Sequence, residues 1–138
     1  MNWAQYMDVV PLANVQPVDR GGEGIACWKS QNDDPQFLLG GLWTELQAGW
    51  YLFEADFQDI DGPFLSPCLY PDYGSGLSEI ERVLLPAPDR DGRIRAVFPL
   101  MHSASMLRFD PSTRMVAFGL AGVTMRKLGR ARALWHLA

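Results

Sequence analysis

Ten prolines and thirteen glycines are spread along the 138 residues and interrupt every stretch that could have formed a long helix. Between residues 8 and 125, no segment keeps apolar residues at the helical spacing i, i+3, i+4, i+7 over three turns. Short runs rich in β-branched and aromatic residues fill this part of the chain, and turn residues separate them at intervals of about 8 to 12 residues. The pattern predicts an all-β chain of about eight or nine short strands, folded as an antiparallel two-sheet β-sandwich or jelly roll.

The clearest of these strands is the aromatic run at residues 50–57. Because side chains alternate between the two faces of a strand, Tyr51, Phe53, Ala55 and Phe57 share one face, which we expect to be the core face. The remaining strands are expected at residues 9–18, 24–30, 36–39, 64–70, 77–85, 93–100, 106–109 and 115–125.

The composition is that of one folded domain, with 48% hydrophobic and 20% charged residues. A chain of this length buries enough surface to fold without a metal or a disulfide. We therefore expect a single β-sandwich domain over residues 1–128, followed by a basic tail or a linker to a further domain over residues 129–138. The Ala, Leu and Arg content of residues 128–137 favours a short C-terminal helix.

The chain shows no sign of a membrane span or of a secretory leader. No apolar run approaches the ~18 residues that a membrane span requires, and the N-terminal residues lack the basic stretch and apolar core of a signal peptide. A cytoplasmic location is therefore expected. The net charge of −4 argues against a general nucleic-acid binder.

Charge is divided unevenly along the chain. All 16 acidic residues lie within residues 1–110, whereas the last 28 residues carry five basic residues and no carboxylate. This basic end contains Arg126, Lys127, Arg130 and Arg132. It is read either as a solvated end that continues into a linker, or as a surface that docks on an acidic partner or on anionic lipids at the inner membrane.

Residues that could support nucleophilic or metal chemistry are sparse. Cys27 and Cys68 are not at metal-ligand spacing, and although a disulfide between them is open, two buried thiols are the favoured interpretation in a reducing compartment. His102 and His136 are the only histidines, and no G-x-S-x-G, H-E-x-x-H, Walker A or G-x-G-x-x-G motif accompanies them. We therefore expect His102 to be a loop histidine bonded to backbone, and we expect no catalytic residue and no cofactor.

A group of carboxylates, Asp56, Asp59 and Asp61, crowds one expected strand end. Solvated turn residues are the favoured interpretation. Half of a calcium-binding loop is a second, and the acid pair of a small hydrolase, working with His102, is a third.

Aromatic residues give a stronger indication of function, because the chain contains 16 of them, five of which are Trp. Sugar rings pack their C–H faces on aromatic rings, and their hydroxyl groups need polar partners beside the ring. Core packing is the alternative for any one of these side chains. The expected ligand-binding residues are Trp43, Trp50, Tyr51, Tyr70, Asp72 and Tyr73.

Three segments in order resemble a known family: LWTELQAGWY at 42–51, PCLYPDYGSGLSE at 67–79 and LRFDP at 107–111. They are similar to the β-sandwich domain at the N-terminus of multi-domain bacterial glycosyltransferases of the rhamnan-synthesis and O-antigen type, and the likeness spans about residues 36–128. The resemblance implies a non-catalytic accessory domain, shaped like a carbohydrate-binding module, in an enzyme that builds surface polysaccharide. The transferase domain itself lies outside residues 1–138, so we expect either an excised domain or a protein that acts alone.

The leading functional prediction is therefore an accessory domain that binds or positions a glycan for a glycosyltransferase of lipopolysaccharide or O-antigen assembly. The alternative is a protein-interaction or spacer module that docks on a partner or a membrane surface through its basic C-terminal end.

Overall fold

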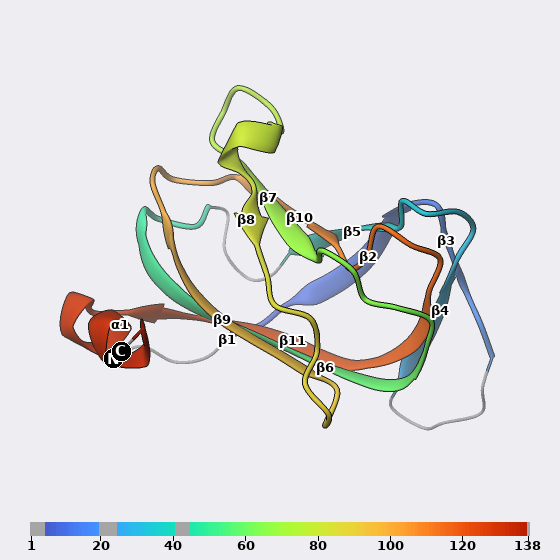
Figure 1. Ribbon diagram of the computed structural model, residues 1–138. Helices are drawn as coiled ribbons and strands as arrows, with labels where there is room; N and C mark the ends of the chain where they lie inside the picture. The colour runs from blue at the N-terminus through green and yellow to red at the C-terminus, as the bar shows by residue number, and fades with distance from the viewer. Residues whose placement is uncertain (1–4, 20–24, 41–44, 138) are drawn as a thin grey trace.

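The computed structural model describes residues 5–19, 25–40 and 45–137, which form two antiparallel sheets packed face to face (Figure 1). The expected all-β sandwich and its short C-terminal helix are both confirmed. Sheet A has the strand order β3 (Val15–Pro17), β4 (Ala26–Ser30), β11 (Ala117–Leu128), β6 (Gly49–Asp61), β9 (Arg93–Leu100), and the short β1 (Gln5–Tyr6) also pairs with β11. Sheet B has the order β2 (Asp8–Ala13), β5 (Gln36–Gly40), β10 (Met106–Asp110), β7 (Cys68–Asp72), β8 (Val83–Leu84).

The core lies between the sheets and is largely aromatic. The predicted inner face of β6 is confirmed, because Tyr51, Phe53, Ala55 and Phe57 are all buried. The ring of Phe53 packs at 5.9 Å from that of Phe109 on β10, across the two sheets. Tilted and edge-on ring pairs of this kind stabilise a core beyond the area that they bury.

The prediction for residues 77–85 is wrong, because a short 3-10 helix, η1 (Glu79–Glu81), takes the place of most of a strand. The side chain of Ser78 accepts a hydrogen bond from the backbone N–H of Ile80 and caps this helix. Ile80, an apolar residue of the expected strand, is 95% exposed. Only Val83 and Leu84 then pair with β7, as the edge strand β8 of sheet B.

The C-terminal helix α1 (Arg130–Leu137) packs on the outer face of sheet A. Its Ala133 is fully buried against Leu52 of β6 and Leu128 of β11. This contact explains why Leu52 is buried although it points away from the sandwich core. Within the described parts of the chain, no helix has the length and apolar character needed to cross a bilayer.

Candidate functional site

The outer face of sheet B, on the side away from the core, carries a cluster of polar side chains. Leu69 and Phe109 point into the core, so their neighbours on β7 and β10 point outward. The antiparallel register sets Arg108 opposite Tyr70. The second and third of the similar sequence segments, at 67–79 and 107–111, therefore meet on this face.

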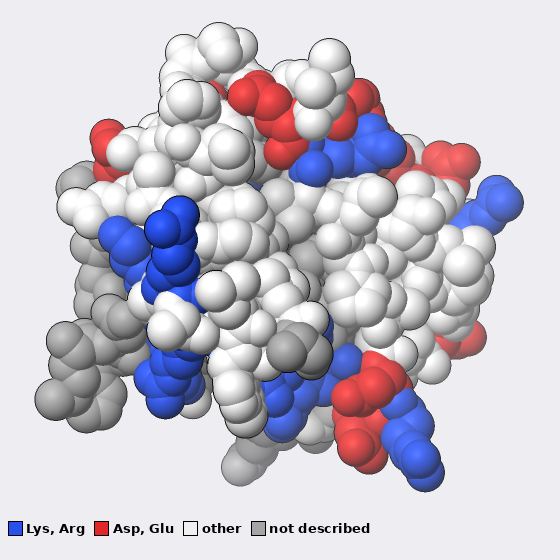
Figure 2. Space-filling view, turned by 60° about the vertical axis from the view of Figure 1, so that its left-hand side comes forward, with Lys and Arg blue, Asp and Glu red and all other residues white. Residues whose placement is uncertain are grey.

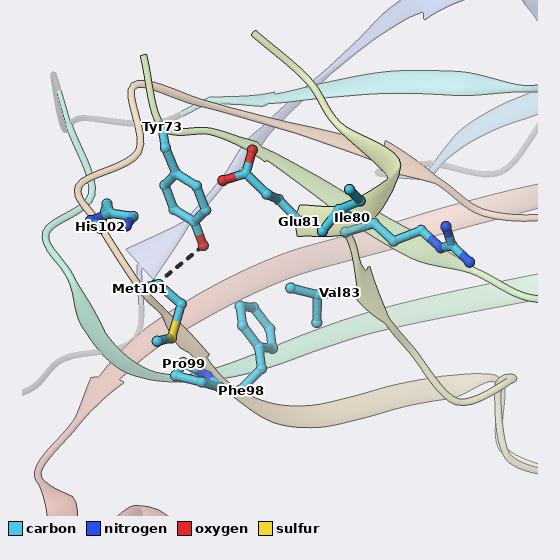
Figure 3. A pocket seen from close by; sticks show the side chains of 9 residues that line it. Tyr73, Ile80, Glu81, Val83, Phe98, Pro99, Met101 and His102 are labelled. Carbon is cyan, nitrogen blue, oxygen red and sulfur yellow. Dashed lines mark hydrogen bonds between the residues drawn. The ribbon is translucent and has the colours of Figure 1, made fainter. Parts of the chain in front are cut away.

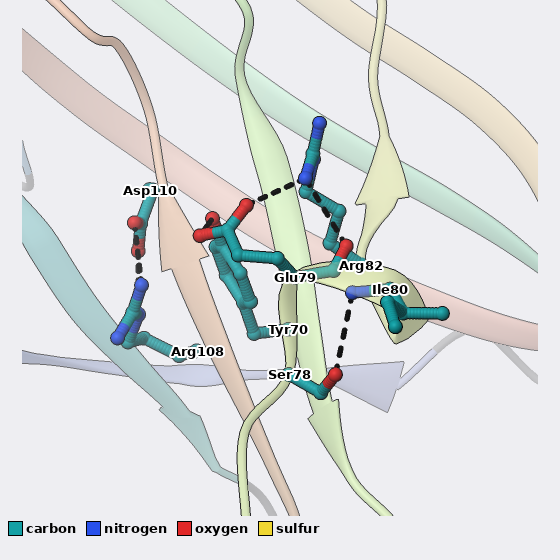
Figure 4. Close-up of polar contacts among 7 residues, drawn as sticks. All are labelled: Tyr70, Ser78, Glu79, Ile80, Arg82, Arg108 and Asp110. Atoms are coloured by element: carbon teal, nitrogen blue, oxygen red, sulfur yellow. Dashed lines mark hydrogen bonds and ion pairs between the residues drawn. The ribbon is translucent and has the colours of Figure 1, made fainter.

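Arg108 is held in place by two neighbours (Figure 4). Its guanidinium donates two hydrogen bonds to the carboxylate of Asp110, from Nε to Oδ1 at 2.8 Å and from Nη2 to Oδ2 at 2.8 Å. The same guanidinium lies over the ring of Tyr70, with Cζ at 4.2 Å from the ring centroid. This combination of a bidentate ion pair and a cation–π contact fixes the planar group in one orientation.

A second set of contacts holds η1 above this face. The hydroxyl of Tyr70 donates to Oε1 of Glu79 at 2.9 Å, and Arg82 pairs with the other oxygen of Glu79. The loop before η1 is closed by Asp72, whose Oδ1 accepts hydrogen bonds from the backbone N–H groups of Gly74 and Gly76. Both glycines have positive φ, the conformation such a turn needs.

Burial changes the ionisation of groups on this face. It raises the pKa of Asp110 above its ordinary value, although Arg108 opposes the rise. Burial also raises the pKa of Tyr70, and the hydrogen bond to Glu79 adds to this effect. Burial raises the pKa of the Cys68 thiol to about 11. Tyr70 therefore remains a hydrogen-bond donor at neutral pH, and Cys68 remains a thiol rather than a reactive thiolate.

A cleft of about 580 Å³ opens beside this network, and we name it the face cleft. Glu79, Arg82 and Asp110 supply charged groups to it, and Leu84 of β8 supplies an exposed apolar wall. Its remaining lining residues are Asp33, Asp34, Ser66, Cys68, Tyr70, Ser112 and Thr113.

A second cleft of about 530 Å³, the edge cleft, lies where β8 and β9 end their sheets (Figure 3). The hydroxyl oxygen of Tyr73 accepts a hydrogen bond from the backbone N–H of Met101 at 3.2 Å. The ring of His102 stands edge-on to that of Tyr73, with 5.4 Å between centroids. The other lining residues are Ile80, Glu81, Arg82, Val83, Phe98 and Pro99. Because η1 and Arg82 line both clefts, the short helix separates one from the other.

The structure places three of the expected ligand-binding residues at or between the two clefts, but not in one site. Tyr70 lines the face cleft, Tyr73 lines the edge cleft, and Asp72 shapes the loop between them. Trp50 instead packs beside α1 on the outer face of sheet A, and Tyr51 is buried in the core with its hydroxyl donating to the Gln47 carbonyl. Trp43 lies outside the described residues. The ligand-binding role of these residues stays a prediction.

The geometry expected for a hydrolase built on Asp56, Asp59, Asp61 and His102 is absent. Asp59 and Asp61 lie at the end of β6, whereas His102 follows β9, whose Leu100 pairs with Gly49 at the start of β6. A strand of 13 residues spans about 40 Å at ~3.3 Å per residue, so the acids and the histidine cannot act together. Asp56 pairs with Arg93 at 2.7 Å.

Three further predictions concern a metal site, a disulfide and His102. Among the residues that the structure describes, no group of three or more His, Cys, Asp or Glu side chains is placed to hold a metal ion. Cys27 and Cys68 are both buried and free, so they are not joined in a disulfide. His102, expected to be held by backbone, is exposed and packs against an aromatic ring.

The charged residues of the face cleft were not among the expected site residues. In the sequence, Arg108 and Asp110 fall at the end of the expected strand 106–109, and Glu79 and Arg82 fall within the expected strand 77–85. The place of Glu79, Arg108 and Asp110 within the similar segments was the one signal that could have indicated them, and Arg82 lies outside these segments.

No protein-family model matches the chain, and no curated protein sequence does. Similar folds are found among solved structures of carbohydrate-binding modules of family 29. A variant of such a module, with a glutamate replaced by arginine, has a TM-score of 0.55 and 7% identity, covering 91% of this chain and 92% of its own. A family 29 module has a TM-score of 0.51 and 10% identity, covering 91% and 77%. A variant with an arginine replaced by alanine, described as probing ligand recognition by these modules, has a TM-score of 0.50 and 8% identity, covering 90% and 79%. At these identities the likeness shows the fold.

Proposed function

We propose that this domain is a non-catalytic glycan-binding module and that the face cleft holds the sugar. The observation that carries the proposal is the set of oriented charged groups that line this cleft beside an apolar wall. Sugar hydroxyl groups both donate and accept hydrogen bonds, and pairs of neighbouring hydroxyls match the two-pronged geometry of carboxylate and guanidinium groups. Leu84 offers a surface for the C–H groups of a sugar ring.

The charged groups that line the face cleft, and Arg108 beside it, differ in how freely they can meet a ligand. Arg108 and Asp110 have side chains that are 18% and 10% exposed and are committed to each other. The side chains of Glu79 and Arg82 are 71% and 38% exposed. We therefore expect Glu79 and Arg82 to make the direct hydrogen bonds with the sugar, and Arg108 and Asp110 to keep that part of the cleft in shape.

The fold likeness supports this proposal, because the similar structures are carbohydrate-binding modules. The wider role rests on the sequence resemblance. In that role the domain positions a glycan for a bacterial glycosyltransferase of O-antigen or lipopolysaccharide assembly, at the cytoplasmic side of the cell envelope. A glycosyltransferase catalytic domain encoded in the same reading frame would support this role, and a neighbouring gene content without any glycosyltransferase would remove it.

Titration with oligosaccharides, followed by calorimetry or by NMR, tests the binding site. We expect Glu79→Gln and Arg82→Gln to weaken binding by about 10-fold to 100-fold each, because each removes a charged hydrogen-bond partner. Met101→Ala in the edge cleft and Arg90→Gln, remote from both clefts, are the controls and should bind as the wild type does. All four side chains are solvent-exposed, so the variants should fold.

The same titration separates the alternatives. Loss of binding with Met101→Ala but not with Glu79→Gln would move the sugar to the edge cleft. Absence of binding to any O-antigen-type oligosaccharide at millimolar concentration would remove the glycan-binding function.

A further inference from the structure

The exposed surface of α1 combines apolar and basic side chains in a regular arrangement. Leu134 is 60% exposed and Trp135 is 75% exposed, although both are large apolar side chains on a helix that buries only Ala133. Leu137, at the end of the helix, is 54% exposed. Isolated exposed apolar residues need no explanation, but three on one short helix do.

The helical period arranges these side chains around the axis. With 3.6 residues per turn, Ala131 lies between Leu134 and Trp135 on the side of the helix that faces away from Ala133. Arg130 lies beyond Leu134 on one flank, and Arg132 lies beyond Trp135 on the other. The outward side of α1 is therefore an apolar stripe with an arginine on each flank.

The strand that leads into α1 extends the basic character of this surface. Arg126 of β11 lies just before the helix and pairs with Leu52, whose side chain is on the outer face of sheet A, whereas Lys127 pairs with Tyr51 of the core face and donates a hydrogen bond to Gln47. Among the described residues, none of Arg126, Lys127, Arg130 and Arg132 lies within ion-pair distance of a carboxylate, whereas the ion pairs of the sandwich use other arginines. In Figure 2, which turns this side of the molecule forward, Lys and Arg side chains gather on the left and lower middle of the face with uncharged side chains between them.

We propose that this surface, the α1 face, docks on the surface of an anionic lipid bilayer. Leu134 and Trp135 enter the boundary between headgroups and acyl chains, where tryptophan is favoured. The long side chains of Arg130 and Arg132 reach sideways to the anionic headgroups. A freely diffusing phosphate would use the arginines but would leave the apolar stripe in water, so the bilayer accounts for both halves of the pattern.

This docking is independent of the face cleft, which lies on the outer face of the other sheet. A domain held on the membrane by sheet A would keep sheet B turned toward the solvent. A failure of vesicle binding would therefore leave the glycan-binding proposal intact, and a failure of glycan binding would leave membrane docking intact.

Sedimentation of the full chain with lipid vesicles tests the proposal. Vesicles of phosphatidylcholine alone are compared with vesicles that also contain phosphatidylglycerol, at low and at high salt. We expect binding only to the anionic vesicles and a fall in binding with added salt, because exposed charges are screened. Each arginine near a bilayer surface contributes about fivefold in affinity, so Arg130→Gln with Arg132→Gln should weaken binding by about 25-fold.

Substitution of the apolar stripe supplies the second half of the test. Leu134→Ser with Trp135→Ser should reduce binding at least tenfold, while Arg90→Gln with Arg114→Gln, which removes two exposed arginines outside the α1 face, should change binding little. Thermal unfolding checks that every variant folds. Equal sedimentation with neutral vesicles, no sedimentation at low salt, or full binding by the serine variant would each overturn the proposal. Concentration-dependent dimerisation that the serine variant abolishes would overturn it in favour of a second copy of the chain as the partner.

Discussion

The pair Arg108–Asp110 allows a sharp test of how the face cleft is held together. Both hydrogen bonds of this bidentate pair measure 2.8 Å, and both side chains are largely shielded from water. Burial raises the pKa of Asp110 although Arg108 opposes the rise, so Arg108 does not fully offset the cost of burying the carboxylate. Burial lowers the pKa of Arg108, but the hydrogen bond and charge of Asp110 outweigh this and raise it, so the two shifts favour opposite conclusions about the pair and largely balance. The pair is therefore not a large net source of stability, but removing one partner leaves the other charge without compensation.

The expected loss of unfolding free energy on breaking the pair follows from how little of its two side chains is exposed. Breaking a fully buried ion pair from one side costs about 3 to 5 kcal/mol. The guanidinium of Arg108 is 18% exposed and keeps its contact with Tyr70, so the lower end of that range applies. We expect Asp110→Ala to lower the free energy of unfolding by about 3 kcal/mol, a large fraction of the ~5 to 15 kcal/mol typical of a domain. Replacing both partners, as Arg108→Met with Asp110→Leu, should restore all but about 1 kcal/mol.

Urea unfolding of the variants measures these differences. The control is Asp56→Ala, which breaks the pair of Asp56 with Arg93 on the outer face of sheet A. That pair has a similar distance of 2.7 Å, but its side chains are about half exposed. The free energy of unfolding should hardly change in this control, because solvent screens such pairs. The reasoning is refuted if Asp110→Ala and Asp56→Ala have equal effects, or if the double replacement is less stable than Asp110→Ala alone.

Three further predictions concern the framework. Gly92→Ala should cost more than the ~1 to 2 kcal/mol of a left-handed backbone alone, because φ is +81° and a Cβ would also lie 2.2 Å from the carbonyl oxygen of Phe57. Gly74→Ala, which has positive φ but open space around it, should cost less. Equal losses of stability in urea unfolding would contradict this. Phe118→Ala should cost about 3 to 5 kcal/mol by calorimetry, since the ring is 1% exposed and packs edge-on against that of Phe57. The folded state holds the proton of Cys68 more tightly than the unfolded state, so the stability from this group is complete below pH 9 and is lost as the pH rises toward 11. The loss should amount to about 2 to 3 kcal/mol and should disappear in Cys68→Ala; an unchanged pH profile in that variant would refute the assignment.

The strand at residues 50–57 and its inner face could be predicted because their determinant is local. Alternation with a period of two separates Tyr51 and Phe53 from Trp50 and Leu52 whatever the rest of the chain does. The terminal helix was predictable for the same reason, from residues with high helix propensity that no glycine or proline interrupts. The burial of Leu52 could not be predicted in this way, because it depends on packing against α1, which is distant in the sequence.

Residues 77–85 show how a local pattern can mislead. Ile80 and Val83 have the composition of a strand, but the serine cap at Ser78 and the anchoring of Glu79 on Tyr70 favour a 3-10 turn. The Ser78 cap is local, but the contact of Glu79 is tertiary, since Tyr70 belongs to another element. The two clefts depend on the same turn, so neither could be predicted before the path of η1 was known.

The most distinctive residues of the similar segments are not the ones that we expect to contact a ligand. Asp72, Tyr70 and Arg108 are the most distinctive side chains of the second and third segments, yet each has its hydrogen-bonding groups or its ring occupied within the protein. Their distinctive spacing is explained by the turn and the stack that they build. A glycan would then contact the residues at the open end of this network, Glu79 and Arg82, whose positions the segments fix indirectly. If the ligand instead displaced Arg108 from Tyr70, the ring would become free to stack on a sugar, and Arg108→Ala would strengthen binding rather than weaken it.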